Sequence, residues 1–140
     1  TGNVACGFLK GYGIKAGAVA LSIAHDSHNI IVVGVSDEEM EFAVNSLIAQ
    51  EGGMVLVREG KVLESMPMPI AGLMSDQSGE WVDEKLTAIH AKAYEELGIA
   101  GDVEPVMTLC FMSLAVIPEV KLTDMGLFDV TTFSFIPVEA

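Results

Sequence analysis

Five consecutive polar residues stand between two apolar runs in the first quarter of the chain, and their side chains could do chemistry. They are His25, Asp26, Ser27, His28 and Asn29, and they include two of the chain's three histidines. Imidazole, carboxylate, hydroxyl and amide groups suit proton transfer, metal ligation or hydrogen bonding to a polar ligand. The pattern His-x-x-His alone is a weak metal signal, because no third or fourth ligand follows at a usual spacing. A structural alternative stays open, in which these residues only build and cap a polar turn.

The elements that must position this polar loop are two short apolar runs. Ala16–Ala24 and Ile30–Val35 are rich in Val, Ile, Ala and Leu, which predicts two buried strands joined by a tight connection. The capping box Ser36-Asp37-Glu38-Glu39 then predicts the start of a helix, whose apolar stripe runs from Met40 to Ile48. Loops held by such rigid elements often carry function.

The rest of the chain predicts a hairpin, a second helix and further strands. Met54–Arg58 and Lys61–Ser65 alternate around Glu59-Gly60, which favours a hairpin, and two prolines exclude residues 66–70 from a central strand. An apolar stripe predicts a helix over Glu80–Leu97. Other strands are expected at Val4–Leu9, Val106–Ile117 and Thr131–Val138, with a turn at Thr123–Gly126. Together these elements predict an α+β fold, with a mostly antiparallel or mixed sheet and two main helices packed on one side of it.

Composition limits the classes of function. The 140 residues predict a single domain over 1–140, and a formal charge of −13 without a basic cluster argues against a nucleic-acid or anionic-membrane partner. Cys6 and Cys110 lie in apolar company, which predicts reduced core residues of a cytoplasmic protein. No basic region of a signal peptide is found at the first residues. The mean hydropathy of +0.47 fits either a sheet covered on both faces or apolar surface covered by a second domain or subunit.

Other candidate residues carry weaker signals. Gly11 and Gly13 form a G-x-G without the third glycine of a dinucleotide-binding turn. His90 lies beside the apolar stripe of the second helix, where a partly buried boundary residue is the usual case. Asp124 and Asp129 are expected in solvated turns. The zinc signature of base deaminases, H-x-E with C-x-x-C, does not occur.

Three segments in this order resemble the C-terminal domain of the adenine deaminase family, in the amidohydrolase superfamily: GFLKGYGIKAGAVALSIAHDSHNIIVVGVSDEEM, MPMPIAGLMS and VIPEVKLTDMGLFDV. The resemblance implies hydrolysis of adenine to hypoxanthine and ammonia in purine salvage. It also implies a dinuclear manganese or iron centre in a barrel domain, where metal ions activate the attacking water. The His-x-His motif of that barrel is absent here. No catalytic residue, no metal ligand and no metal bound by this chain alone is therefore expected.

The same resemblance implies a substrate-binding role for the polar loop. His25, Asp26, Ser27, His28 and Asn29 match the motif of the family and are expected to close over adenine at the mouth of the barrel. The implied partners are the N-terminal barrel of the same polypeptide, adenine, and further copies in a homo-oligomer. The chain alone is expected to be inactive. Two alternatives stay open: a non-catalytic docking or oligomerisation domain, and a free-standing small-ligand binding module.

Overall fold

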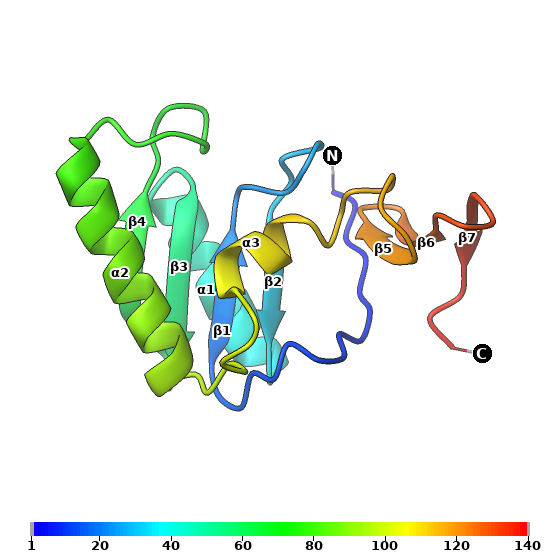
Figure 1. Ribbon diagram of the computed structural model, residues 1–140, viewed down its shortest axis with the longest axis horizontal. Helices are drawn as coiled ribbons and strands as arrows, with labels where there is room; N and C mark the ends of the chain where they lie inside the picture. The colour runs from blue at the N-terminus through cyan, green and yellow to red at the C-terminus, as the bar shows by residue number, and fades with distance from the viewer. Residues whose placement is uncertain (1, 140) are drawn as a thin grey trace.

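A four-stranded antiparallel sheet is the centre of the computed structural model, which describes residues 2–139 (Figure 1). Its strand order is β2-β1-β3-β4, and every neighbouring pair runs antiparallel. The strands are β1 (Ala18–Leu21), β2 (Ile31–Gly34), β3 (Gly53–Arg58) and β4 (Lys61–Pro67). A separate, smaller antiparallel sheet lies at one end of the molecule, close to the C-terminus. Its strand order is β5-β6-β7, and its strands are β5 (Val120–Thr123), β6 (Gly126–Asp129) and β7 (Ser134–Ile136). Antiparallel sheets with helices confirm the α+β fold.

Helices cover both faces of the larger sheet. On one face, Ala18 and Ala20 of β1 form a core with Leu47 of α1 (Asp37–Ala49). On the other face, Val19 and Leu21 pack with residues of α2 (Gly79–Glu95) and α3 (Pro105–Cys110). The expectation that the helices lie on one side was wrong, because β1 and β3 carry apolar side chains toward both faces. Within residues 2–139, no helix combines the length and apolarity that crossing a bilayer requires.

Local signals correctly predicted the elements on either side of the polar loop. The two apolar runs form β1 and β2, with Leu21 opposite Ile31 in the ladder. The helix α1 begins as expected, since the hydroxyl of Ser36 accepts a hydrogen bond from the Glu39 N–H at 3.3 Å. The Glu39 carboxylate does not accept the Ser36 N–H, as a full capping box would require. It accepts the Glu59 N–H of the predicted hairpin turn instead, at 2.6 Å.

The proline-containing segment and the second helix also follow their predictions. Residues 66–70 do not form a central strand, since β4 ends at Pro67 on the edge of the sheet. Helix α2 starts after Ser78, whose hydroxyl accepts the Trp81 N–H. The predicted turn at Thr123–Gly126 joins β5 and β6.

Two of the predicted strands are wrong, and a third is shorter than expected. Val4–Leu9 contains no strand. The run Val106–Ile117 contains helix α3 instead, because Glu104 caps the Met107 N–H and Pro105 occupies the first helical turn. Of Thr131–Val138, only Ser134–Ile136 is strand, since residues 131–133 form a turn.

The packing of α1 on the larger sheet gives a matched test of the core. Leu47 is fully buried, whereas its neighbour Ile48 is 58% exposed. We expect Leu47→Ala to lower the free energy of unfolding by about 2–5 kcal/mol, because it leaves a cavity against β1 and β3. Ile48→Ala is expected to cost less than about 0.5 kcal/mol. Urea denaturation followed by circular dichroism measures both, and equal effects would contradict this packing.

The two cysteines differ in environment, contrary to the expectation that both lie in the core. Cys110 is buried and Cys6 is exposed. Burial, with the nearby Glu104 carboxylate, raises the pKa of the Cys110 thiol to about 11. At pH 8 only about one Cys110 side chain in a thousand is therefore in the thiolate form. Because the thiolate is the reactive form of cysteine, Cys110 should react slowly in the native chain. We expect a disulfide reagent to modify one thiol per native chain at pH 8 and two after unfolding; rapid modification of both native thiols would contradict the burial.

Candidate functional site

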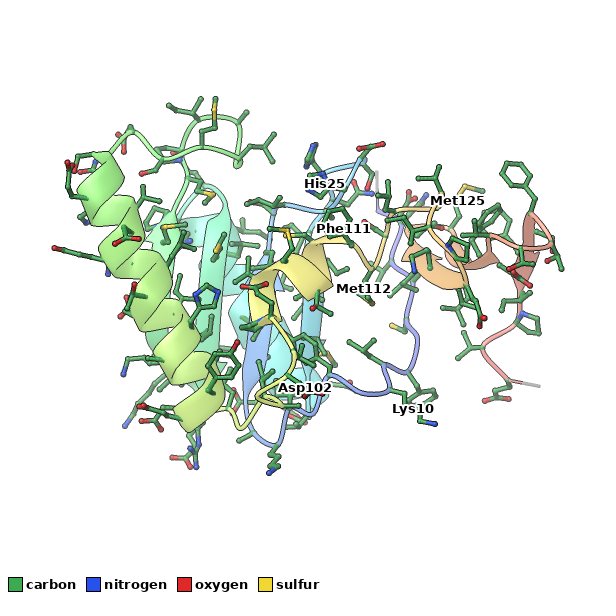
Figure 2. All side chains as sticks on the ribbon, viewed as in Figure 1. Lys10, His25, Asp102, Phe111, Met112 and Met125 are labelled. Carbon is green, nitrogen blue, oxygen red and sulfur yellow. The ribbon has the colours of Figure 1, made fainter. Side chains whose placement is uncertain are left out.

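The polar loop between β1 and β2 is a tight turn whose base is held by helix α3. The His25 N–H donates to the Cys110 carbonyl, and the Ser113 hydroxyl donates to the His25 carbonyl, both at 3.0 Å. The His25 ring stacks on Phe111, with 4.9 Å between ring centroids and 26° between planes (Figure 2). The turn closes through the His28 N–H, which donates to the Ala24 carbonyl at 2.6 Å. His25 is thus anchored by the C-terminal end of α3.

The remainder of the loop is free of that helix. Asp26, Ser27, His28 and Asn29 are exposed, whereas His25 is half-buried. The rings of His25 and His28 meet edge to face at 5.7 Å. No ion pair joins Asp26 to either histidine in the part of the chain that the structure describes. The exposed polar side chains are therefore available to a ligand.

Three loop residues line a groove of about 700 Å³ between the two sheets. Asp26, Ser27 and Asn29 form one side. The turn between β5 and β6 contributes Thr123, Asp124 and Met125. The remaining walls are mainly apolar and come from residues 3–5, 24, 30–32, 113–116 and 122, and from the aromatic rings of Phe128 and Phe135. The volume lies in the usual range of small-molecule sites. Polar groups beside aromatic rings suit a planar, polar molecule.

The groove contains residues that were not candidates from the sequence. Ser113, Thr123 and Asn3 line it without having been singled out, and Asp124 was expected only in a solvated turn. Asp124 does lie exposed in a turn, where its carboxylate accepts a hydrogen bond from the Asn3 amide at 3.4 Å. The sequence signal that could have indicated Thr123 and Asp124 was the distinctive segment KLTDMGL. The fold brings this segment to the same groove as AHDSHNI.

His25 lines a different cavity, of about 280 Å³, between α2 and α3. The His90 ring is hydrogen-bonded to the Glu104 carboxylate there, and the remaining walls are mainly apolar. Glu104 also caps α3, so one carboxylate fixes this helix against α2. His90 is half-buried beside the apolar stripe of α2, as its spacing indicated. The structure therefore divides the five predicted loop residues: three line the groove, His28 lies exposed at the tip, and His25 faces the helices.

Two buried groups near Glu104 are held neutral. The Tyr12 hydroxyl donates to the Pro105 carbonyl at 2.9 Å, and burial together with the Glu104 charge raises the pKa of Tyr12. The same two causes raise the pKa of Cys110. Because their charged forms are disfavoured, neither side chain is suited to act as an anionic base near neutral pH.

The described residues do not offer a metal centre. Nowhere in residues 2–139 do three or more His, Cys, Asp or Glu side chains gather as metal ligands would. His25 and His28 approach each other, but no third ligand joins them. A dinuclear centre does not fit this set of side chains, so no metal ligand is assigned to this chain.

Comparison with known proteins places the chain in a family. A family model described as the adenine deaminase C-terminal domain matches residues 1–134. Adenine deaminase 2 of Desulfotalea psychrophila is 74% identical over the whole chain, and adenine deaminase of Halalkalibacterium halodurans is 53% identical over 96% of it. The chain covers 24% of the first relative and 23% of the second, so it spans about a quarter of the length of the curated relatives it matches. Because the family model matches residues 1–134 and these relatives are 74% and 53% identical, the chain belongs to the family of adenine deaminase C-terminal domains.

Proposed function

We propose that this chain acts as the C-terminal part of an adenine deaminase, which hydrolyses adenine to hypoxanthine and ammonia. The names of its relatives support the reaction, and the groove supports a part in substrate binding. The observation that carries the proposal is the convergence of Asp26, Ser27 and Asn29 with Thr123 and Asp124 on one groove. These side chains come from two segments far apart in the sequence.

The proposed role of the loop follows from the hydrogen-bonding groups of adenine. The base presents an exocyclic amine as donor and ring nitrogens as acceptors. An asparagine amide can pair with both at once, as it does with the N6 and N7 atoms of adenine in nucleic acids. In this proposal Asn29 makes that pair, the Asp26 carboxylate accepts an N–H, and the Ser27 hydroxyl donates or accepts. His28 is a fourth proposed contact, and His25 holds the loop through its stacking on Phe111.

The proposed reaction needs groups that this chain does not supply. We place the dinuclear manganese or iron centre in an N-terminal barrel of the same polypeptide, where bound metal ions would activate water. Residues 2–139 contribute binding and orientation of the base, and exclusion of bulk water from the groove. The chain alone is therefore proposed to be inactive, and the full-length enzyme to be a cytoplasmic homo-oligomer.

A docking or oligomerisation domain is the second candidate function. Large apolar side chains of the N-terminal segment and of β5–β7 are exposed, among them Phe8 and Phe133. Exposed apolar surface of this kind is typical of a site of protein contact. The two functions are compatible, since a docked domain can also present a loop to a substrate.

Loop substitutions in the full-length enzyme test the substrate-binding role. We expect Asp26→Asn and Asn29→Ala each to lower kcat/KM for adenine about tenfold in the presence of Mn²⁺, which corresponds to about 1.4 kcal/mol. Asn29→Ala removes the proposed hydrogen bonds of the amide, and Asp26→Asn replaces a charged acceptor with a weaker neutral one. His28→Asn removes the imidazole but suits the positive φ of 50° at this position, so it tests the ring alone. The control is Asp83→Asn, the same substitution at an exposed position of α2, which is expected to change nothing.

Melting temperatures separate binding from stability. All four variants alter exposed side chains, so we expect melting temperatures within about 2 °C of the wild type. Loop variants as active as Asp83→Asn would make the loop a structural turn and favour the docking function. A wild-type enzyme without adenine deamination would contradict the proposed reaction itself.

A further inference from the structure

We propose that an apolar patch at the β5–β7 end of the chain is the docking face for the N-terminal remainder of the same polypeptide. We define the patch by the most exposed apolar side chains of the N-terminal segment, the segment after α3, and the smaller sheet: Val4, Phe8, Val116, Met125, Phe133 and Phe135. Four of these, Val4, Val116, Met125 and Phe135, line one groove, and Phe133 packs on Phe128 of the same groove. This inference rests on the proposed function only in that the chain is part of a longer deaminase. It identifies the surface and its occupant.

Exposure of apolar side chains is concentrated in this part of the molecule. Among residues 2–139, ten of the eighteen exposed large apolar side chains lie within residues 4–9 and 116–138. Four of the six phenylalanines lie in these two segments, and Phe8 and Phe133 are 96% and 78% exposed. Isolated exposed apolar residues are normal, but a concentration of this kind marks an interaction site.

The smaller sheet lacks the cover that the larger sheet has. On one side, the row Leu122, Leu127 and Ile136 faces the N-terminal segment, and a Cβ added to Gly7 would lie 3.0 Å from Leu127. On the other side, the Phe128 ring packs edge to face with Phe133 and Phe135, at 5.2 and 5.3 Å between centroids. Figure 1 shows no helix over this sheet. Three short strands without such cover are marginal in water.

The charge distribution favours an apolar protein partner over a charged ligand. Residues 4–9 carry no charged side chain, although 19% of the whole chain is charged. In residues 116–138 the charged side chains are Glu119, Lys121, Asp124 and Asp129, and only Asp129 follows residue 124. The Asp129 carboxylate is already used, since it accepts the Thr131 and Thr132 N–H groups at 2.8 and 3.3 Å. Depletion of charge with enrichment of Phe is typical of the core of a protein interface.

The N-terminal remainder of the polypeptide is the occupant that the chain itself favours. About three quarters of each curated relative lies outside the matched region, and the family description places this region at the C-terminal end. The first described residues lie at the patch, where Asn3 donates to Asp124 of the β5–β6 turn. The preceding chain of a full-length enzyme would therefore emerge beside the patch, which gives it a high effective concentration there.

Cleavage of the full-length polypeptide before Thr1, at an inserted protease site, tests the proposal. Size-exclusion chromatography then shows whether the two fragments stay together. We expect co-elution for the wild type and separation for the double variant Phe8→Lys, Phe133→Lys, with at least a tenfold weaker association. The control is Ile48→Lys, which places the same charge on an exposed apolar position of α1 and should co-elute. Circular dichroism checks that all variants are folded.

Other outcomes would contradict either the docking face or the proposed function. Separation of the wild-type fragments would exclude stable docking, and co-elution of the double variant would move docking to another face. If the double variant instead converts oligomers to single copies while its fragments stay together, the occupant is a second copy of the chain. Adenine deamination is measured on the uncut wild type. An inactive enzyme whose fragments co-elute contradicts the proposed function but not the docking face.

Discussion

Burial of β1 on both faces is the constraint on which the rest of this structure depends. Its four residues, Ala18 to Leu21, are completely inaccessible to solvent. The small side chains face α1, and the large ones face α2 and α3. Gly34 of the neighbouring strand β2 lets α1 and β1 approach closely. A Cβ added at this position would lie 2.6 Å from Met40 and 2.8 Å from Ala18. Alternation of small and large residues thus sets the distances between the layers.

The polar loop gains its order from elements attached to the end of this strand. Ser22, directly after β1, accepts the Gly53 N–H at 2.7 Å and donates to the Gly72 carbonyl at 2.5 Å, which joins three segments. On the other side, the end of α3 and the turn after it hold His25. The His25 N–H donates to the Cys110 carbonyl, the Ser113 hydroxyl donates to the His25 carbonyl, and the His25 ring stacks on Phe111. Glu104 in turn ties α3 to His90 of α2. The base of the loop is therefore fixed, while its tip is exposed. A fixed base with free polar groups is what a ligand-positioning loop needs.

The groove and the apolar patch share residues, which connects the two proposals. Val4, Val116, Met125 and Phe135 line the groove and also belong to the patch. A domain docked on the patch would therefore close the open side of the groove next to Asp26 and Asn29. Exclusion of water from such a site strengthens hydrogen bonds to a bound base. In this arrangement the substrate would lie between two domains, where ligand sites often occur.

Local patterns determined much of the fold. The Ser36 and Ser78 caps, the alternating hairpin and the two apolar runs each act within a few residues, so α1, α2 and β1–β4 could be predicted from the sequence alone. The residue types of the polar loop likewise indicated hydrogen-bonding chemistry. The prediction failed over Val106–Ile117, where a nearly continuous apolar run has no period that separates helix from strand. The Glu104 cap and Pro105 favour the helix there.

Only the tertiary structure decided which residues meet at the groove. It brought Asp26 and Asn29 beside Thr123 and Asp124, and turned His25 away toward α2 and α3. It also placed helices on both faces of one sheet and left the other sheet without a covering helix. The physical reason is the range of the interactions. Propensity and capping act between neighbours in the chain, whereas the groove and the patch depend on packing between segments about a hundred residues apart.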